Sequence, residues 1–208
     1  MEIVEVLDMP ENKKAELLNS KAAREESRPE EVVALLRLKS GQVVADIGSG
    51  GGYFSLMMAE AVGKSGKVYM VDTDRKMLDF ALGFCRQKGV FNTEAMLADE
   101  TGPHLPKGKI DLIFMRSVCH HVKNREEYFA ALKHFLAPGG RVALIDYPRG
   151  NFLGFRWLKG HYAEAENVEK EMAEAGFARV QKFSLPRQWF MVFSLPTAHE
   201  RKEINIKH

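Results

Sequence analysis

The sequence is poor in cysteine, since its 208 residues contain only Cys85 and Cys119. The two lie far apart along the chain, and the sequence has no Cys-x-x-Cys pair and no Cys/His ladder. A disulfide scaffold and a structural zinc site are therefore excluded as the basis of the fold. This cysteine usage suits a reducing compartment, and we expect the protein to be cytoplasmic.

The sequence also has no large excess of positive or negative charge, no long apolar run and no internal repeat. Lys plus Arg number 30 and Asp plus Glu number 28, and the net charge of +2 is too small to indicate a nucleic-acid partner. No apolar run approaches the roughly 18 residues that cross a bilayer, so no membrane association is expected. The first residues carry Glu2, Glu5, Asp8 and Glu11, which does not fit a secretory signal.

What the sequence does contain is an alternation of short apolar segments with helical patterns. Hydrophobic residues make up 45% of the chain, enough for one full-sized core. The predicted strands are Val43–Ile47, Lys67–Asp72, Thr93–Leu97, Ile110–Arg116, Arg141–Asp146, Ala178–Phe183 and Gln188–Leu195. The predicted helices are Ala15–Leu38 with a break at Pro29, Tyr53–Val62, Arg75–Lys88, Arg125–Phe135 and Ala163–Ala175. This order indicates an α/β fold whose parallel sheet is covered on both faces.

The end of the chain departs from the parallel pattern. Only Ser184–Arg187 joins the last two predicted strands, and so short a link forces them to be antiparallel. Gly176 is predicted to cap the helix before them, and Pro29 suits the first turn of a second N-terminal helix. The sequence therefore predicts a doubly wound, mostly parallel sheet that ends in an antiparallel hairpin.

A glycine-rich turn follows the first predicted strand, at the edge of the sheet where ligands bind in folds of this kind. It reads Asp46-Ile47-Gly48-Ser49-Gly50-Gly51-Gly52. Glycine at positions 48, 50 and 52 lets the backbone turn tightly and approach a ligand without interference from Cβ atoms. A tight loop that binds nothing is the alternative explanation.

Acidic residues follow the second and third predicted strands. Asp72, next to Thr73, lies roughly 20 residues beyond the glycine turn, where an acid can accept hydrogen bonds from both hydroxyls of a ribose. Asp74 has a simpler role as the N-terminal cap of the next helix. Asp99 and Glu100 follow the third strand, where a carboxylate can accept a hydrogen bond from the exocyclic amine of adenine.

Two classes of nucleotide cofactor share this layout, and two residues separate them. A dinucleotide site with the pattern Gly-x-Gly-x-x-Gly needs glycine at position 53, which here is Tyr53. Asp46 would repel a pyrophosphate but suits a ligand that carries an ammonium and a sulfonium. The residues therefore favour a cationic ligand, with a nicotinamide-dependent oxidoreductase as the alternative.

From about Val43 to Tyr147 the chain resembles the class I S-adenosylmethionine-dependent methyltransferase family, in particular its small-molecule branch. The resemblance rests on the glycine turn with its strand, on Val71-Asp72, on Ala98-Asp99 and on Leu136-Ala137-Pro138-Gly139-Gly140-Arg141. It implies a Rossmann-like sheet of seven strands whose last strand is antiparallel. The last motif is a helix-to-strand turn in that family. The resemblance implies a methyltransferase domain over residues 41–208, and residues 1–40 are predicted to form a helical lid.

The resemblance also implies S-adenosylmethionine as cofactor, with S-adenosylhomocysteine as its product. The cofactor-binding residues that it implies are Asp46, Gly48, Ser49, Gly50, Gly52, Asp72, Thr73, Asp99, Glu100, Arg116 and Ser117. Of these, Asp46 and the backbone of the glycine turn would lie near the methionine portion. Asp72 would bind the ribose, and Asp99 would lie near the adenine amine.

The residues after the fourth predicted strand bear on the methyl acceptor. Enzymes that methylate exocyclic base amines carry an Asn/Asp-Pro-Pro-aromatic signature there, whereas this chain has Arg116-Ser117-Val118-Cys119-His120-His121. His121, or with less preference His120, is a candidate general base, because histidine takes up a proton near neutral pH. A histidine here can instead shape the pocket. No metal is predicted, because position 116 is arginine where a carboxylate ligand would be useful.

The connection Tyr147–Tyr162 mixes aromatic residues with cations. It indicates a flat or anionic small-molecule substrate or, with equal weight, an amphipathic cover helix. The sequence therefore predicts S-adenosylmethionine-dependent methylation of a small molecule. A cofactor-binding module without catalysis is a further alternative, and the oligomeric state stays open, with a homodimer as one option.

Overall fold

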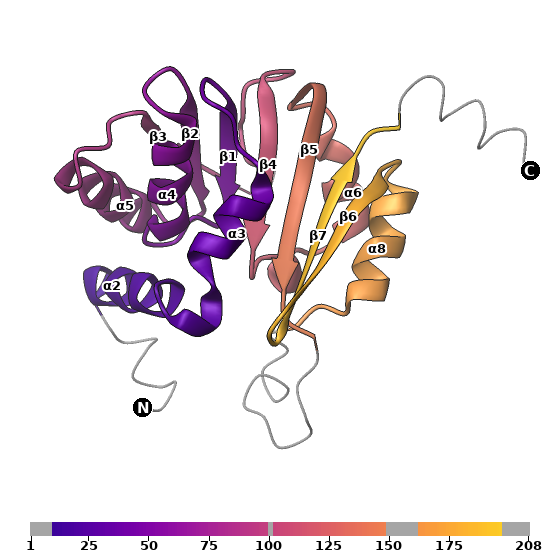
Figure 1. The fold of residues 1–208 in the computed structure, drawn as a ribbon, viewed down its shortest axis with the longest axis horizontal. Helices are drawn as coiled ribbons and strands as arrows, with labels where there is room; N and C mark the ends of the chain where they lie inside the picture. Colours follow the sequence, from indigo (N-terminus) through magenta and orange to yellow (C-terminus); the bar gives the residue numbers. More distant parts are fainter. Residues whose placement is uncertain (1–9, 100–101, 149–161, 197–208) are drawn as a thin grey trace, which may run out of the picture. The chain divides into compact units, whose positions relative to one another are not determined.

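In the computed structural model the described residues are 10–99, 102–148 and 162–196. They contain a seven-stranded sheet with the strand order β3-β2-β1-β4-β5-β7-β6 (Figure 1). The Rossmann-like α/β fold with an antiparallel C-terminal hairpin is thereby confirmed. The chain divides into two compact units, the first ending at Leu105 and the second beginning at Pro106. No helix within the described ranges is long and apolar enough to cross a membrane.

The first unit contains three parallel strands, β1 (Val43–Ile47), β2 (Lys67–Asp72) and β3 (Thr93–Leu97). Strand β1 is buried from its second residue onward, as expected of a parallel strand covered on both faces. Helices α4 (Tyr53–Val62) and α5 (Arg75–Gln87) follow β1 and β2. Each parallel crossover therefore places a strand end next to a helix start, which is where the glycine turn and Asp72 lie.

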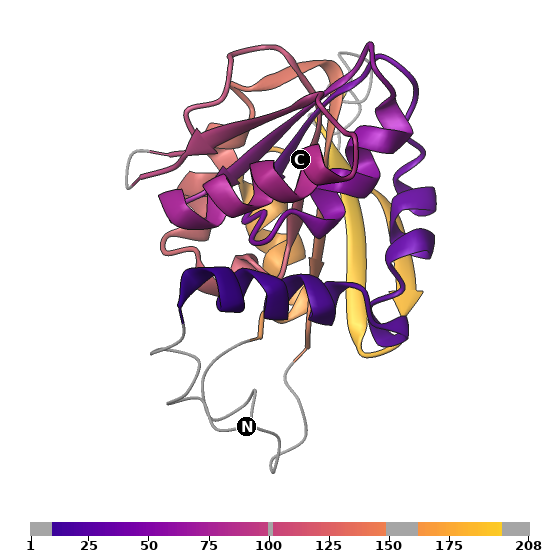
Figure 2. The ribbon, with the colours of Figure 1, turned by 90° about the vertical axis from the view of Figure 1, so that its left-hand side faces the viewer.

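The N-terminal part of the first unit is helical, with α2 (Glu11–Ala22), a short 3-10 turn η1 (Glu25–Ser27) and α3 (Pro29–Leu36). Pro29 occupies the first turn of α3, as predicted. Helix α2 packs on α5 and α4, and Figure 2 shows it lying alongside α5. The side chain of Asn19 donates a hydrogen bond of 2.8 Å to the carbonyl of Gly51, so α2 is attached directly to the glycine turn. A lid function for these helices stays a prediction.

The second unit continues with β4 (Ile110–Arg116), a 3-10 turn η2 (Cys119–His121), α6 (Arg125–Leu132) and β5 (Leu136–Asp146). It ends with α8 (Ala165–Glu174), β6 (Ala178–Leu185) and β7 (Gln188–Ser194). Strands β4 and β5 are parallel, and β7 is antiparallel to both β5 and β6. Gly176 has φ of +88° just beyond α8, which is the conformation of the predicted cap.

The structure corrects the sequence prediction at β5. Leu136–Arg141 was expected as a turn before the strand, but β5 begins at Leu136. Leu136 pairs with Ile110 of β4, and the register shifts before Leu112 pairs with Arg141. A Cβ atom at Gly140 would lie 2.7 Å from the carbonyl oxygen of Ile110, so glycine lets the irregular segment stay paired with β4. The turn η2 was not predicted either.

Candidate active site

Asp46 lies near the end of β1 with its side chain buried, only 3% exposed. The hydroxyl of Ser55, in the first turns of α4, donates a hydrogen bond to Asp46 Oδ2. A buried carboxylate is costly unless it is hydrogen-bonded, so Ser55 holds the acid in place beneath the glycine turn. The sequence analysis missed Ser55, because a serine inside a helical pattern carries no signal of its own.

The glycine turn is tied to the end of β2 by backbone hydrogen bonds. The amides of Gly48 and Ser49 both donate to the carbonyl of Val71, at 2.8 and 3.0 Å. Gly50 has φ of +53°, and its amide donates to Asp72 Oδ2 at 3.0 Å. These hydrogen bonds, including the one to Asp72, hold the ends of β1 and β2 together within this unit.

Asp72 is half-buried and binds backbone with both carboxylate oxygens. Besides the amide of Gly50 on Oδ2, it accepts the amide of Asp74 on Oδ1 at 3.2 Å. Each carboxylate oxygen has a second lone pair, so these bonds leave capacity for two ribose hydroxyls. Asp74 itself accepts the amides of Lys76 and Met77 at the start of α5, which confirms its predicted role as the N-terminal cap.

The glycine turn has the features of a polar ligand cradle. The hydroxyl oxygen of Ser49 is buried and has no hydrogen-bond partner within the described part of the chain. A buried hydroxyl without a partner costs free energy that a polar ligand would recover. A Cβ atom at Gly51 would lie 2.6 Å from the carbonyl oxygen of Ala15, so this backbone passes very close to α2. Ser49, Asp46 and Asp72 together fit a nucleoside that carries an ammonium group.

The other side chains of the first unit that were predicted to bind the cofactor are exposed or lie outside the described residues. Thr73 is exposed. The Asp99 carboxylate is largely exposed and lies 2.9 Å from Nε2 of His104, a partner that the sequence analysis did not identify. Glu100 lies outside the described residues, and so does most of the connection Tyr147–Tyr162.

In the second unit, Arg116 ends β4 and is half-buried. Its Nη2 atom lies 3.3 Å from the hydroxyl of Tyr147 and 3.3 Å from Oε1 of Gln188. These two groups are uncharged, and both distances are long for an N–H···O hydrogen bond. Ser117 follows with φ of +56°, and its amide donates to Ile145 of β5 at 2.8 Å. This bend directs the chain into η2.

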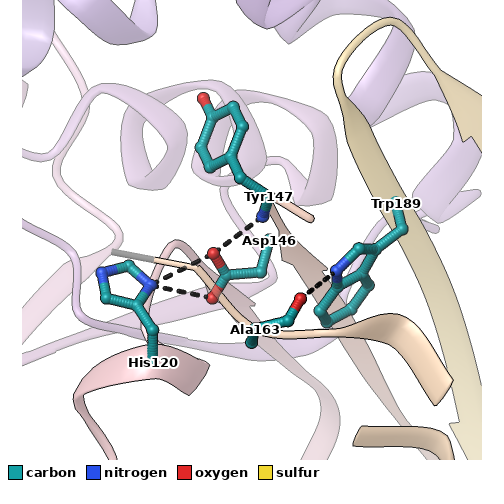
Figure 3. A network of polar contacts seen from close by, with 5 residues as sticks. All are labelled: His120, Asp146, Tyr147, Ala163 and Trp189. Atoms are coloured by element: carbon teal, nitrogen blue, oxygen red, sulfur yellow. Dashed lines mark hydrogen bonds and ion pairs between the residues drawn. The ribbon is translucent and has the colours of Figure 1, made fainter. Parts of the chain in front are cut away.

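The turn η2 brings His120 against the carboxylate of Asp146, the last residue of β5 (Figure 3). Nδ1 of His120 lies 3.1 Å from each carboxylate oxygen. The amide of Tyr147 donates to Asp146 Oδ1 at 2.8 Å. The ring of His121 lies 4.1 Å from that of His120 between centroids, but His121 is exposed. His120 is thus paired with a buried carboxylate, whereas His121, the residue preferred from sequence alone as general base, is exposed.

The family model of a methyltransferase domain matches residues 44–140, the stretch from β1 to β5 that contains these strand ends. The chain belongs to the class I S-adenosylmethionine-dependent methyltransferase family. The cofactor of this family is S-adenosylmethionine, as predicted. This finding favours the methyltransferase over the oxidoreductase alternative.

Two named groups occur among the curated relatives of this chain. It is 30% identical over 183 residues to phosphoethanolamine N-methyltransferase of Triticum aestivum, covering 83% of this chain and 35% of that protein. It is 24% identical over 136 residues to demethylmenaquinone methyltransferase of a Geobacillus strain, covering 64% of this chain and 57% of that protein. The chain spans about a quarter to a third of the plant relatives that it matches.

Solved structures show the same fold. A SAM-dependent methyltransferase from Aquifex aeolicus superimposes with a TM-score of 0.79 at 23% identity, covering 88% of this chain and 97% of that one. Phosphoethanolamine N-methyltransferase 2 of Haemonchus contortus, in complex with phosphomonomethylethanolamine and S-adenosylhomocysteine, has a TM-score of 0.62 at 19% identity. The latter match covers 77% of this chain and 50% of that chain.

Both cysteines, Cys85 and Cys119, are fully buried. Burial raises the pKa of the Cys85 thiol to about 11, and it raises the pKa of Cys119 further still. Both thiols are therefore protonated at neutral pH and unsuited to nucleophilic chemistry. In the described ranges no group of three or more His, Cys, Asp or Glu side chains is arranged to hold a metal ion.

Proposed function

We propose that this chain binds S-adenosylmethionine through its first unit and methylates a small-molecule acceptor. The proposal rests on the glycine turn, in which the Gly50 amide donates a hydrogen bond to Asp72 and the Ser49 hydroxyl is buried without a partner within the described residues. When bound, S-adenosylmethionine supplies an activated methyl group. The chain's main contribution to methyl transfer is then alignment of the two reactants.

Several of the predicted cofactor-binding residues have a specific role in this proposal. Asp46 provides negative charge for the cofactor's cationic end, and Ser49 offers its hydroxyl to the same portion. Asp72, with Thr73 beside it, takes the ribose hydroxyls. Asp99 takes the adenine amine. These assignments rest on the family resemblance and on the positions of the residues at strand ends.

For the acceptor we propose a small phosphorylated amino alcohol of the phosphoethanolamine type. The plant relatives with that name are 30–34% identical to this chain, whereas those named for demethylmenaquinone are 24–25% identical. Arg116 supports an anionic acceptor, because it places a half-buried guanidinium at the end of β4, beside the uncharged side chains of Tyr147 and Gln188. A phosphate would offer that guanidinium stronger, charge-assisted hydrogen bonds. We therefore assign Arg116 to the acceptor rather than to the cofactor.

Replacing Arg116 with glutamine is expected to raise the KM for phosphoethanolamine at least tenfold, because charge-assisted hydrogen bonds to phosphate contribute roughly 1.5–3 kcal/mol. The affinity for S-adenosylmethionine should change little. Initial rates are measured by mass detection of the methylated product, with the exposed Arg86→Gln as the matched control. Methyl transfer to demethylmenaquinone alone, or a loss of cofactor affinity without a change in acceptor KM, would contradict this acceptor.

A cytoplasmic location also belongs to the proposal. It is supported by two buried cysteines that form no disulfide with each other. Fractionation of cells that express the tagged chain tests it directly, since recovery in an oxidising compartment would contradict it.

A further inference from the structure

The connections that lead into the first three strands are basic. Strands β1, β2 and β3 are parallel, so their amino ends lie at one edge of the sheet of the first unit, opposite the glycine turn (Figure 1). The connections that enter this edge are residues 37–42, 63–66 and 88–92, and none of them contains Asp or Glu. Together with the adjoining helix and strand ends they carry six cations, which are Arg37, Lys39, Lys64, Lys67, Arg86 and Lys88.

Side-chain hydrogen bonds hold these three connections side by side. The hydroxyl oxygens of Ser40 and Ser65 lie 3.4 Å apart, which joins the first connection to the second. The side-chain amide of Asn92 donates a hydrogen bond of 2.9 Å to the carbonyl of Gly63, which joins the third connection to the second. The six cations are therefore gathered on one surface, which we call the basic edge, although they come from three separate stretches of the sequence.

Acidic residues are sparse around the basic edge. Lys67 forms an ion pair of 2.7 Å with Glu94 of β3. Glu60 is the other acid in the adjoining last helical turns and first strand residues. The other five cations of the basic edge are exposed. The small net charge of the whole chain therefore does not describe this surface, which is strongly positive.

Phe91 lies on the same surface, in the connection that also carries Lys88. Its side chain is 76% exposed, which makes it the most exposed of the large apolar residues in the described ranges. An aromatic ring in water would gain free energy from burial in an apolar medium. Lys and Arg combined with an exposed Phe are typical of surfaces that bind to anionic membranes, where the cations meet lipid headgroups and the ring enters the acyl boundary.

We propose that the basic edge is a docking surface for anionic phospholipid membranes, with the Phe91 ring inserted at the level of the headgroups. This inference does not depend on the proposed methyl transfer. No membrane association was expected from the sequence, because no apolar run is long enough to span a bilayer. A peripheral contact needs no such run. Its charges come together only in the folded chain, so the total charge of the sequence did not indicate it.

A nucleic acid is the other polyanion that a cluster of exposed cations attracts. Sites for single strands stack successive bases on several aromatic side chains along a groove. Phe91 is the only aromatic residue in the three connections of the basic edge. A single exposed ring among cations therefore favours a bilayer, which accepts one inserted side chain, over a strand of stacked bases.

Docking through the basic edge would direct the glycine turn away from the bilayer. The glycine turn and Asp72 lie at the carboxyl ends of β1 and β2, and strands of this length separate the two edges by about 17–20 Å. The carboxyl edge of the first unit would then stay open to water, as a water-soluble acceptor requires. Substitutions in the basic edge are therefore expected to leave S-adenosylmethionine binding unchanged.

Vesicle flotation of the full chain in low salt tests the inference. The wild-type chain should bind vesicles made of equal parts phosphatidylglycerol and phosphatidylcholine, but not vesicles of phosphatidylcholine alone. The triple variant Lys39→Gln, Lys64→Gln and Lys88→Gln should bind about 100-fold more weakly, because each cation near an anionic membrane contributes about 1 kcal/mol and 1.4 kcal/mol is a factor of ten. Phe91→Ser should bind about tenfold more weakly, as expected for the loss of a buried phenyl ring.

The matched control removes the same charge from the opposite edge, by Lys21→Gln, Arg75→Gln and Lys76→Gln. All three residues are exposed, and this end of α2 adjoins the glycine turn through the bond from Asn19 to Gly51. The control should bind the mixed vesicles like the wild-type chain.

Four outcomes would overturn the inference. They are no binding of the wild-type chain to the mixed vesicles, equal binding to phosphatidylcholine alone, equal losses in the two triple variants, and binding to single-stranded RNA in place of vesicles. Calorimetry with S-adenosylmethionine verifies that the basic-edge variants are folded. A wild-type chain that binds the mixed vesicles but not S-adenosylmethionine would contradict the proposed function and leave the docking surface supported.

Discussion

Replacing Asp72 with alanine is expected to weaken S-adenosylmethionine binding by about 100-fold. The change removes a carboxylate that would receive two ribose hydroxyls, and each hydrogen bond to a charged group contributes roughly 1.5–3 kcal/mol. A loss of 1.4 kcal/mol corresponds to a factor of about ten in Kd. The change also removes the bond to the Gly50 amide, so the glycine turn loses one of its hydrogen bonds to β2. Isothermal titration calorimetry measures the effect.

Asp74→Ala is the matched control for this prediction, because it removes a neighbouring carboxylate with a different task. Asp74 caps α5 through the amides of Lys76 and Met77, so its loss should cost about 1 kcal/mol of stability. Cofactor affinity should fall much less than in Asp72→Ala. Equal losses of affinity in the two variants would mean that Asp72 affects cofactor binding only by stabilising the segment between β2 and α5.

Replacing Gly52 with alanine should have the second large effect, on both stability and cofactor binding. Gly52 has φ of +86°, and a Cβ atom there would lie 2.9 Å from the Cβ of Ala81 in α5. Positive φ alone costs an L-residue roughly 1–2 kcal/mol, and the contact adds to it. We expect a loss of about 2–3 kcal/mol, which lowers Tm by roughly 5–10 °C in a chain of this size.

Comparison with Gly89→Ala separates the two causes of the stability loss in Gly52→Ala, which are backbone strain and the contact with Ala81. Gly89 also has a positive φ, +78°, but a Cβ atom there would meet nothing within 4 Å. It should therefore cost only the backbone strain, about 1–2 kcal/mol, and leave cofactor affinity unchanged. Thermal unfolding with and without S-adenosylmethionine tests both variants. Wild-type affinity in Gly52→Ala would show that the turn tolerates displacement and does not hold the cofactor.

The features that sequence predicted well depend on short-range chemistry. Alternating apolar strands and helices predicted the parallel sheet, and a link too short for a crossover predicted the hairpin of β6 and β7. Asp74 and Gly176 were correctly assigned as caps because capping requires only the adjacent helix end. Asp72 and the glycine turn, which bond to each other in the structure, were singled out because both follow strands. Their binding of the cofactor stays a prediction.

The features that sequence missed depend on contacts between distant residues. His120 and Asp146 are 26 positions apart, and their pairing depends on the register of β4 with β5 and on the turn η2. Asp146 does end a predicted strand, so the rule that identified Asp72 would have found it too. The bond from Asn19 to Gly51 spans 32 positions and depends on how α2 packs, which no local pattern specifies. The early start of β5 likewise follows from its pairing with β4.

Calorimetric titration of the wild-type chain with S-adenosylmethionine and with S-adenosylhomocysteine tests whether the glycine turn and Asp72 bind the cofactor. We expect saturable binding of each compound at a single site, mutual competition, and loss of both heats in Asp72→Ala but not in Asp74→Ala. A folded wild-type chain that gives no heat with either compound would contradict it.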